Sequence, residues 1–151
     1  MKTMIKAALT GVFSLVIGVG SITAQLRKVP AEVTDAFKEK FPNATKVEWK
    51  DKLSAFQASY EEEGVHYTAK FTSKGEWLQT EKDIEEAALP AAVKDGFDKS
   101  KFTEWELKSV SRIDNKDNTV QYRIFVKKSN VEKKYLYFNE EGRLVKENIT
   151  I

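Results

Sequence analysis

The sequence predicts an α+β fold built from two copies of one unit, a helix followed by a four-strand antiparallel meander. The first observation is an internal match, because Val29–Phe37 (VPAEVTDAF) recurs 60 residues later as Leu89–Phe97 (LPAAVKDGF). The second is a match between Lys70–Leu78 and Tyr137–Val145, which lie 67 residues apart in the same order. Repeated segments in a constant order are typical of tandem structural units. We therefore expect a duplicated fold, with both helices packed on one face of a combined sheet of roughly eight strands.

The first residues, 1–24, have the pattern of a cleavable signal peptide. Two lysines provide positive charge, an uncharged apolar run follows over residues 7–20, and residues 21–24 are mostly small. Signal peptidase recognises this order. The apolar run is shorter than the roughly 20 residues that span a bilayer, so an uncleaved membrane anchor is the less favoured alternative. We expect a mature protein that begins at Gln25, carries no lipid, has no membrane contact after cleavage, and is periplasmic or secreted.

The composition of the mature chain limits the classes of partner. Removing residues 1–24 takes away two lysines and no acid, which leaves 23 basic residues against 23 acidic ones. A neutral chain without a basic stripe binds nucleic acid poorly, because phosphate neutralisation supplies most of that affinity. The chain has no cysteine, so its fold has to be held by a hydrophobic core rather than by disulfides. We expect residues 25–86 to form the first helix-plus-sheet unit and residues 87–151 the second.

Each unit is expected to open with a helix that begins at a proline, since the fixed φ and missing N–H of proline suit the first turn. Gly96 is expected to weaken the second helix by about 1 kcal/mol relative to alanine. In the first helix, apolar residues recur at spacings of three and four, which places them on one stripe; they are Val33, Ala36, Phe37 and Phe41. In the second helix the corresponding residues are Val93, Phe97 and Phe102.

Four strands are expected after each helix, because apolar and polar residues alternate there with a period of two. The expected strands lie near residues 46–50, 56–61, 65–71 and 76–81 in the first unit, and near 105–107, 120–126, 133–138 and 143–146 in the second. The additional residues of the second unit are expected in a loop at 114–118. Gly75 and Gly142 each lie four residues after an apolar phenylalanine. We expect them to hold equivalent turn positions with φ above zero.

These features together resemble a known family. A signal peptide followed by two units of the form V/L-P-x-x-V-x-D-x-F, each with a meander and a glycine turn, resembles the PepSY-like family of exported bacterial proteins. That family is similar in fold to β-lactamase-inhibitor protein, which has two tandem helix-plus-sheet units and a concave sheet face. The resemblance covers nearly all of residues 28–148 and implies a binding or inhibitory module. Its motifs are structural, so no functional residue is transferred from the family.

The sequence contains no recognisable catalytic or metal-binding motif. A nucleophile elbow, a phosphate-binding glycine loop and a zinc helix motif are all absent. With no cysteine and with His66 as the single histidine, neither a Cys–His pair nor a multi-histidine metal site can form. His66 is interpreted as a solvated strand residue and the neighbouring Glu61–Glu63 as a hairpin tip rather than a calcium site. We predict a protein that is not an enzyme and that has no cofactor and no metal.

One departure from strict alternation predicts a binding surface. If the aliphatic residues of the strand near 120–126 face the helix, three aromatic rings of the second unit lie on the opposite face beside two cations. Aromatic rings rimmed by Arg and Lys have the usual composition of a binding hot spot. The alternative is that a loop, a terminus or a dimer partner covers these rings. We expect their replacement with serine to leave folding nearly intact. The candidate binding residues are Phe125, Tyr135, Tyr137, Arg123 and Lys127.

The function that the sequence favours is an exported, non-catalytic binding module. Its partner is expected to be a protein, such as a periplasmic enzyme that it inhibits, bound through the exposed sheet face. Two alternatives stay open. Self-association through the same face would give a homodimer with a structural or assembly role. Binding of a small molecule would require an enclosed apolar pocket with convergent polar groups.

Overall fold

The structure is a computed structural model that describes residues 27–150. Eight strands form one antiparallel sheet in which each strand pairs with the next along the chain. This confirms an α+β fold with two helices and a single eight-stranded sheet. The expected signal peptide, residues 1–24, lies outside the described residues.

In chain order the elements are α1 (Ala31–Lys40), β1 (Thr45–Asp51), β2 (Phe56–Glu62), β3 (Val65–Phe71), β4 (Trp77–Ile84), the 3-10 turn η1 (Glu86–Ala88), α2 (Ala91–Asp98), β5 (Glu106–Asn115), β6 (Val120–Lys127), β7 (Lys133–Asn139) and β8 (Leu144–Ile149).

The central strand β5 is much longer than the sequence pattern predicted. The prediction of a loop at 114–118 is wrong for residues 114 and 115, which belong to β5. Asp114 pairs with Thr80 of β4 and with Val120 of β6, so it lies within the sheet. An irregularity in the pairing between Leu107 and Ser109 breaks the alternation of β5. A bulge of this kind shifts the side-chain phase, which hides the strand from a period-two search.

Two apolar clusters hold the helices on the sheet. In the first, Val33 and Phe37 of α1 pack on Phe56, Ala58 and Tyr60 of β2 and on their neighbours. In the second, Val93 and Phe97 of α2 belong to a cluster made mainly by β6 and β7. Residues paired directly across antiparallel strands share a face. The pairing registers from β2 to β7 therefore assign both clusters to the same side of the sheet.

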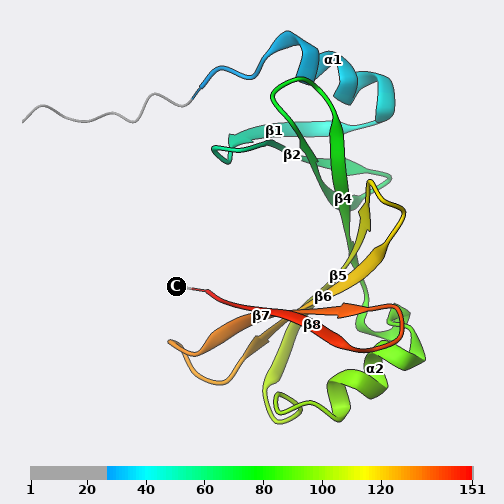
Figure 1. Cartoon of the computed structure of the whole chain (residues 1–151), viewed down its shortest axis with the longest axis vertical. Coiled ribbons are helices and arrows are strands. Elements are labelled where there is room, and N and C mark those ends of the chain that lie inside the picture. Colours follow the sequence, from blue (N-terminus) through cyan, green and yellow to red (C-terminus); the bar gives the residue numbers. More distant parts are fainter. Residues whose placement is uncertain (1–26, 151) are drawn as a thin grey trace, which may run out of the picture.

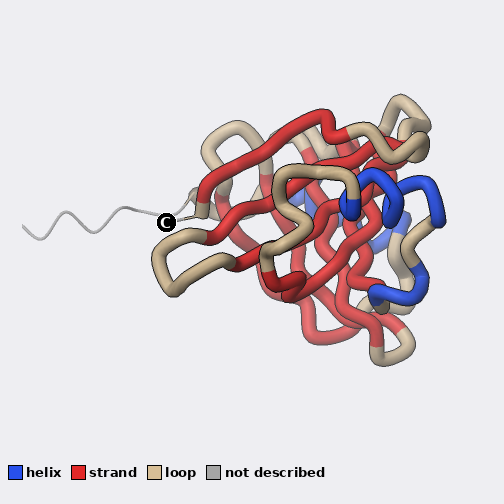
Figure 2. The backbone as a smooth tube through the Cα atoms, turned by 90° about the horizontal axis from the view of Figure 1, so that it is seen from below, coloured by secondary structure: helices blue, strands red, loops and turns tan. Residues whose placement is uncertain are grey.

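The sheet is strongly curved, and the two helices lie on its outer side (Figure 1). Helix α1 covers β1 and β2 at one end, α2 lies beneath β7 and β8 at the other, and the first and last strands face each other across the inside of the bend. In the view of Figure 2 the helical segments gather at one side of the strands. The inner side, which neither helix covers, is called the concave face below. Neither helix of residues 27–150 is long and apolar enough to cross a bilayer.

Two similar glycine turns, one in each half of the sheet, pack against the two helices. Gly75 has φ +82° and Gly142 has φ +78°, which confirms that both adopt the left-handed conformation. The Gly75 N–H donates to the Thr72 carbonyl at 3.1 Å, and the Gly142 N–H donates to the Asn139 carbonyl at 3.0 Å. Each turn also packs against the helix that precedes it in the chain, Gly75 on Glu32 and Gly142 on Ala92. Both glycines are therefore needed for conformation and for close approach.

Gly96 has a packing role that the sequence did not indicate. A Cβ built on Gly96 would overlap the carbonyl group of Gly142. Ala36, which aligns with Gly96 in the internal sequence match, has its Cβ 3.4 Å from a Cβ built on Gly75. The glycine in α2, which lowers helix propensity, thus allows the helix to approach its turn more closely than α1 approaches Gly75.

Arg27 fixes the first described residues to the end of β1. Its Nε donates to Asp51 Oδ2 at 2.7 Å, and the backbone N–H of Leu53 donates to Asp51 Oδ1 at 2.9 Å. The hydrogen bond from the Arg27 side chain is the largest of the effects that lower the pKa of Asp51 from 3.8 to about 2. The lowered pKa means that the ionised carboxylate stabilises the folded chain.

This arrangement predicts a specific acid dependence of stability. Because the folded-state pKa lies below the unfolded value, the contribution of Asp51 is complete above pH 3.8 and is lost as the pH falls toward about 2. We expect Asp51→Asn to lower stability at neutral pH and to flatten the stability curve in this window, measured by urea unfolding at a series of pH values. Asp95→Asn, which removes only an exposed pair with Lys99, is the matched control. Parallel curves for wild type and Asp51→Asn would contradict the assignment.

Candidate binding surface

Strands β6 and β7 place the predicted binding residues on the concave face. The side chains of Ile124, Val126 and Leu136 are fully buried on the helix side, so the residues between them point the other way. Phe125 pairs with Tyr135 in the sheet register. The strand phase expected from the sequence is therefore confirmed.

The three aromatic rings are half-buried rather than freely exposed. The ring centroids of Phe125 and Tyr135 are 4.9 Å apart with an interplanar angle of 34°. Tyr137 lies two residues along β7, and Lys146 Nζ lies 5.4 Å from its ring centroid. Because these rings already pack on neighbours, serine replacements are expected to remove some stabilising contacts while the protein stays folded. Loss of these contacts should cost about 1–3 kcal/mol in total.

Arg123 is held by three neighbours on this face. Its guanidinium forms an ion pair with Glu81 of β4. The Cζ atom lies 4.6 Å from the Tyr135 ring centroid, and Nη2 lies 3.5 Å from Ser111 Oγ. A guanidinium fixed by an ion pair and an aromatic ring loses little conformational freedom when a partner binds. Arg123 is thus a pre-organised donor in the middle of the surface.

Lys127 belongs to the same face but lies at its margin. It is the last residue of β6, where it pairs with Lys133 of β7 and Glu106 of β5. The structure therefore brings together Arg123, Phe125 and Tyr135 as one contact group. Tyr137 pairs with Arg123 across the strands, and Lys127 extends the surface toward the β6–β7 turn.

The floor of the concave face contains three buried residues that the sequence did not point to. Glu81 is 7% exposed, Ser111 is 1% exposed and Ile113 is 3% exposed. Ser111 Oγ donates to Asp83 Oδ1 at 3.1 Å. Glu81 and Ser111 are the two buried polar residues of the described chain. Their burial comes from the pairing of β4 with β5 in the middle of the sheet, which no local pattern in either strand reveals.

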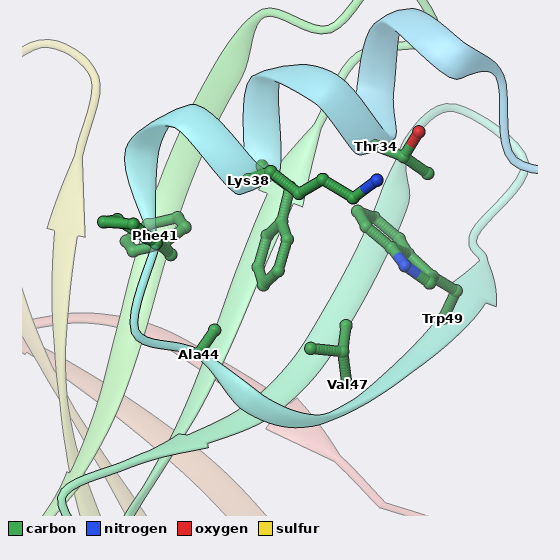
Figure 3. Close-up of a pocket in the computed structure, with 8 residues that line it drawn as sticks. Thr34, Lys38, Phe41, Ala44, Val47 and Trp49 are labelled. Atoms are coloured by element: carbon green, nitrogen blue, oxygen red, sulfur yellow. The ribbon is translucent and has the colours of Figure 1, made fainter.

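A separate pocket lies between α1 and the edge strand β1 (Figure 3). Its volume is about 380 Å³. The lining is mostly apolar, and the Lys38 side chain runs along the helix side of the pocket toward Trp49 (Figure 3). The other polar side-chain groups of the lining are the indole N–H of Trp49 and the hydroxyl of Thr34, and this hydroxyl donates a hydrogen bond of 3.0 Å to the Ala31 carbonyl. Few polar groups are thus available in this pocket to orient a small ligand. Its lining residues are Thr34, Phe37, Lys38, Phe41, Pro42, Ala44, Val47 and Trp49.

His66 is exposed on β3, where it pairs with Glu61 of β2. Within residues 27–150, no group of three His, Asp or Glu side chains is arranged to hold a metal ion.

Comparison with known proteins decides the family. The family model described as "Putative beta-lactamase-inhibitor-like, PepSY-like" matches residues 55–146, which is more than half of the chain. The chain belongs to this PepSY-like family. The resemblance drawn from the repeated motifs is thereby confirmed. No curated protein matches the chain.

Several solved structures share the fold of this PepSY-like protein. A protein from Bacteroides eggerthii, described as periplasmic, superimposes with a TM-score of 0.74 at 23% identity, over 82% of this chain and 90% of the other. A BLIP-like protein from Bacteroides fragilis superimposes with a TM-score of 0.68 at 26% identity, over 84% and 90%. A DUF2874 family protein from Bacteroides uniformis gives 0.74 at 21% identity, over 81% and 90%. These relatives support the fold of the whole described chain.

Proposed function

We propose that this PepSY-like protein is an exported, non-catalytic binding module that holds a protein partner on its concave sheet face. The observation that carries the proposal is the contact group of Arg123, Phe125 and Tyr135, half-buried and pre-organised on a face that no helix covers. Arg and Tyr are enriched among the residues that dominate binding energy at protein interfaces. A curved sheet suits a convex segment of a partner.

Binding is favoured over catalysis by the chemistry of this face. Its central charged groups, Arg123 and Glu81, neutralise each other, and the chain has one histidine and no cysteine to act as base or nucleophile. The family to which the chain belongs is itself described as inhibitor-like. Inhibition of a periplasmic enzyme is a specific form of this proposal.

A periplasmic location is part of the same proposal. It is supported by the signal-peptide pattern of residues 1–24. It is also supported by the structural relative from Bacteroides eggerthii, which is described as a periplasmic protein.

The two helix-plus-sheet units are proposed to be copies of one ancestral unit. Their glycine turns support this origin. The Thr72 N–H donates to the Glu76 carbonyl at 2.8 Å, and 67 residues later the Asn139 N–H donates to the Arg143 carbonyl at 3.0 Å. On this origin the aromatic contact group is specific to the second copy, since the positions of the first unit that match Phe125 and Tyr135 by register are Ser59 and Thr68.

The experiment that tests the function uses the mature protein, residues 25–151, to capture partners from periplasmic extract. A captured protein is then purified and titrated against wild type and a variant carrying Phe125→Ser, Tyr135→Ser and Tyr137→Ser. We expect the triple variant to stay folded by circular dichroism and to bind at least about tenfold more weakly, a loss of about 1.4 kcal/mol. Lys94→Ser, on the exposed surface of α2, is the control and should bind like wild type.

Unchanged affinity of the folded triple variant would overturn the proposal. Self-association through the same face is the competing function, and the mass of the pure protein in solution separates the two. A monomeric mass would support binding of a different protein rather than self-association. A dimer that the triple variant dissociates would favour self-association.

A further inference from the structure

Lys70 is a half-buried cation on the floor of the concave face. Its neighbours in β3, Ala69 and Phe71, are buried in the α1 cluster, so the Lys70 side chain points to the opposite side. It pairs with Gln57 of β2 and Gln79 of β4, which are both uncharged. Burial is the main effect that lowers the pKa of Lys70, as expected for an ammonium that is partly removed from water.

Three of the four charges that act on Lys70 are positive, and the largest single charge effect is the attraction of a carboxylate. The four charges are one carboxylate, Glu81, and three cations, Arg123, Lys52 and Lys146. Lys52 follows β1 and Lys146 belongs to β8, so the curvature of the sheet brings charges from its two ends toward one residue. Glu81 already forms its ion pair with Arg123. Within residues 27–150, Lys70 itself has no carboxylate within ion-pair distance.

The concave side of β6, β7 and β8 extends this positive region. By register it carries four cations and three aromatic rings, and no carboxylate of these three strands points to this side. Glu147 of β8 is on the opposite face, where it lies 3.3 Å from Lys101 and from Lys134. The cations on the concave side are Arg123, Lys127, Lys133 and Lys146.

We propose that the concave face receives an acidic segment of its protein partner, with a carboxylate of that segment bound to Lys70. This inference rests on the proposed function and specifies the chemistry of the partner. A carboxylate beside Lys70 would compensate a cation that lacks an ion pair and on which three other cations act. Such complementarity chiefly determines specificity and association rate.

Two features favour an acidic protein segment over a phosphate-rich polymer or an anionic membrane. The aromatic rings beside the cations need apolar side chains to pack against them, and a protein segment offers both carboxylates and apolar groups. The mature chain also has equal numbers of acidic and basic residues, so its overall field does not attract polyanions. The positive region is local to part of the concave face, namely Lys70 and the concave side of β6, β7 and β8.

The test measures binding of a short acetylated peptide rich in glutamate and leucine to isotope-labelled protein 25–151, followed by amide chemical shifts. We expect saturable shifts at Lys70, Arg123 and Tyr135, and weaker binding of the same peptide with glutamine in place of glutamate. Lys70→Met should reduce affinity about tenfold, in line with loss of one charge-assisted contact. Lys70→Arg should retain binding. Lys94→Met removes the same charge from the exposed surface of α2 and should have no effect.

The inference is overturned if the glutamine peptide binds as tightly, if Lys70→Met binds like wild type, or if a phosphorylated peptide or phosphatidylglycerol vesicles bind in preference. A captured partner separates this inference from the proposed function. If the aromatic triple variant loses the partner while Lys70→Met retains it, the concave face binds a partner that is not acidic. If neither variant loses the partner, both proposals fail.

Discussion

Replacing Gly142 with alanine should lower the free energy of unfolding by about 2–6 kcal/mol, because two costs add at this position. The φ of +78° imposes backbone strain on any residue with a Cβ, typically about 1–3 kcal/mol. The added methyl would also overlap the carbonyl of Ala92, and overpacking of this kind costs about 1–3 kcal/mol. Both costs lower the free energy of unfolding of the variant. Urea unfolding of the purified variant measures it.

A graded series of glycine replacements separates strain from overlap. Gly64 has φ +77° but nothing within 4 Å of an added Cβ, so Gly64→Ala should show the strain alone. Gly75→Ala should cost more, since its Cβ would lie 2.5 Å from the Glu32 carbonyl oxygen. The loss of stability is therefore expected to be smallest in Gly64→Ala, larger in Gly75→Ala and largest in Gly142→Ala. Equal losses in all three variants would contradict the proposed contact between turns and helices.

Arg123→Met is the second replacement with a large expected effect. It leaves Glu81, which is 7% exposed, without its ion-pair partner in the floor of the concave face. Removing one member of a buried pair typically costs about 3–5 kcal/mol, because the other charge stays buried. Lys70 also interacts with Glu81 and compensates part of its charge. We therefore expect Arg123→Met to lower the free energy of unfolding by about 2–4 kcal/mol. Chemical unfolding gives the value.

A double-mutant cycle distinguishes the ion pair from the other contacts of Arg123. Glu81→Gln removes the charge that Arg123 compensates, so Arg123→Met should cost less in the Glu81→Gln background. We expect a coupling energy of about 1–3 kcal/mol, in the range of residues that share an ion pair. Additive losses would mean that stacking on Tyr135, rather than the pair with Glu81, holds Arg123 in place.

Local patterns predicted the strands of the outer parts of the sheet well. Ile124, Val126 and Leu136 alternate with polar or aromatic residues, and one face of β6 and β7 is buried by α2, so period two gave the correct phase. The turn positions of Gly75 and Gly142 followed from glycine chemistry and from the internal match. Each of these features is encoded within a few residues.

The centre of the sheet was less predictable because its properties depend on pairing between distant strands. The bulge near Lys108 concealed the length of β5. Glu81 and Lys70 look like ordinary polar residues of half-exposed strands, and only the register across β3 to β6 and the curvature of the sheet bring them toward Arg123. The predicted aromatic residues were found on the correct face, but the buried Glu81 beside them had no signal in the sequence.

Site-specific photo-crosslinking tests the central claim, partner binding by the concave face, most directly. A benzophenone amino acid is placed at Tyr137 on the concave face or at Lys94 on the exposed surface of α2, and the protein is irradiated in the periplasm of living cells. We predict a discrete adduct with one partner protein from position 137 and none from position 94. Adducts from position 94 together with none from position 137 would contradict the claim.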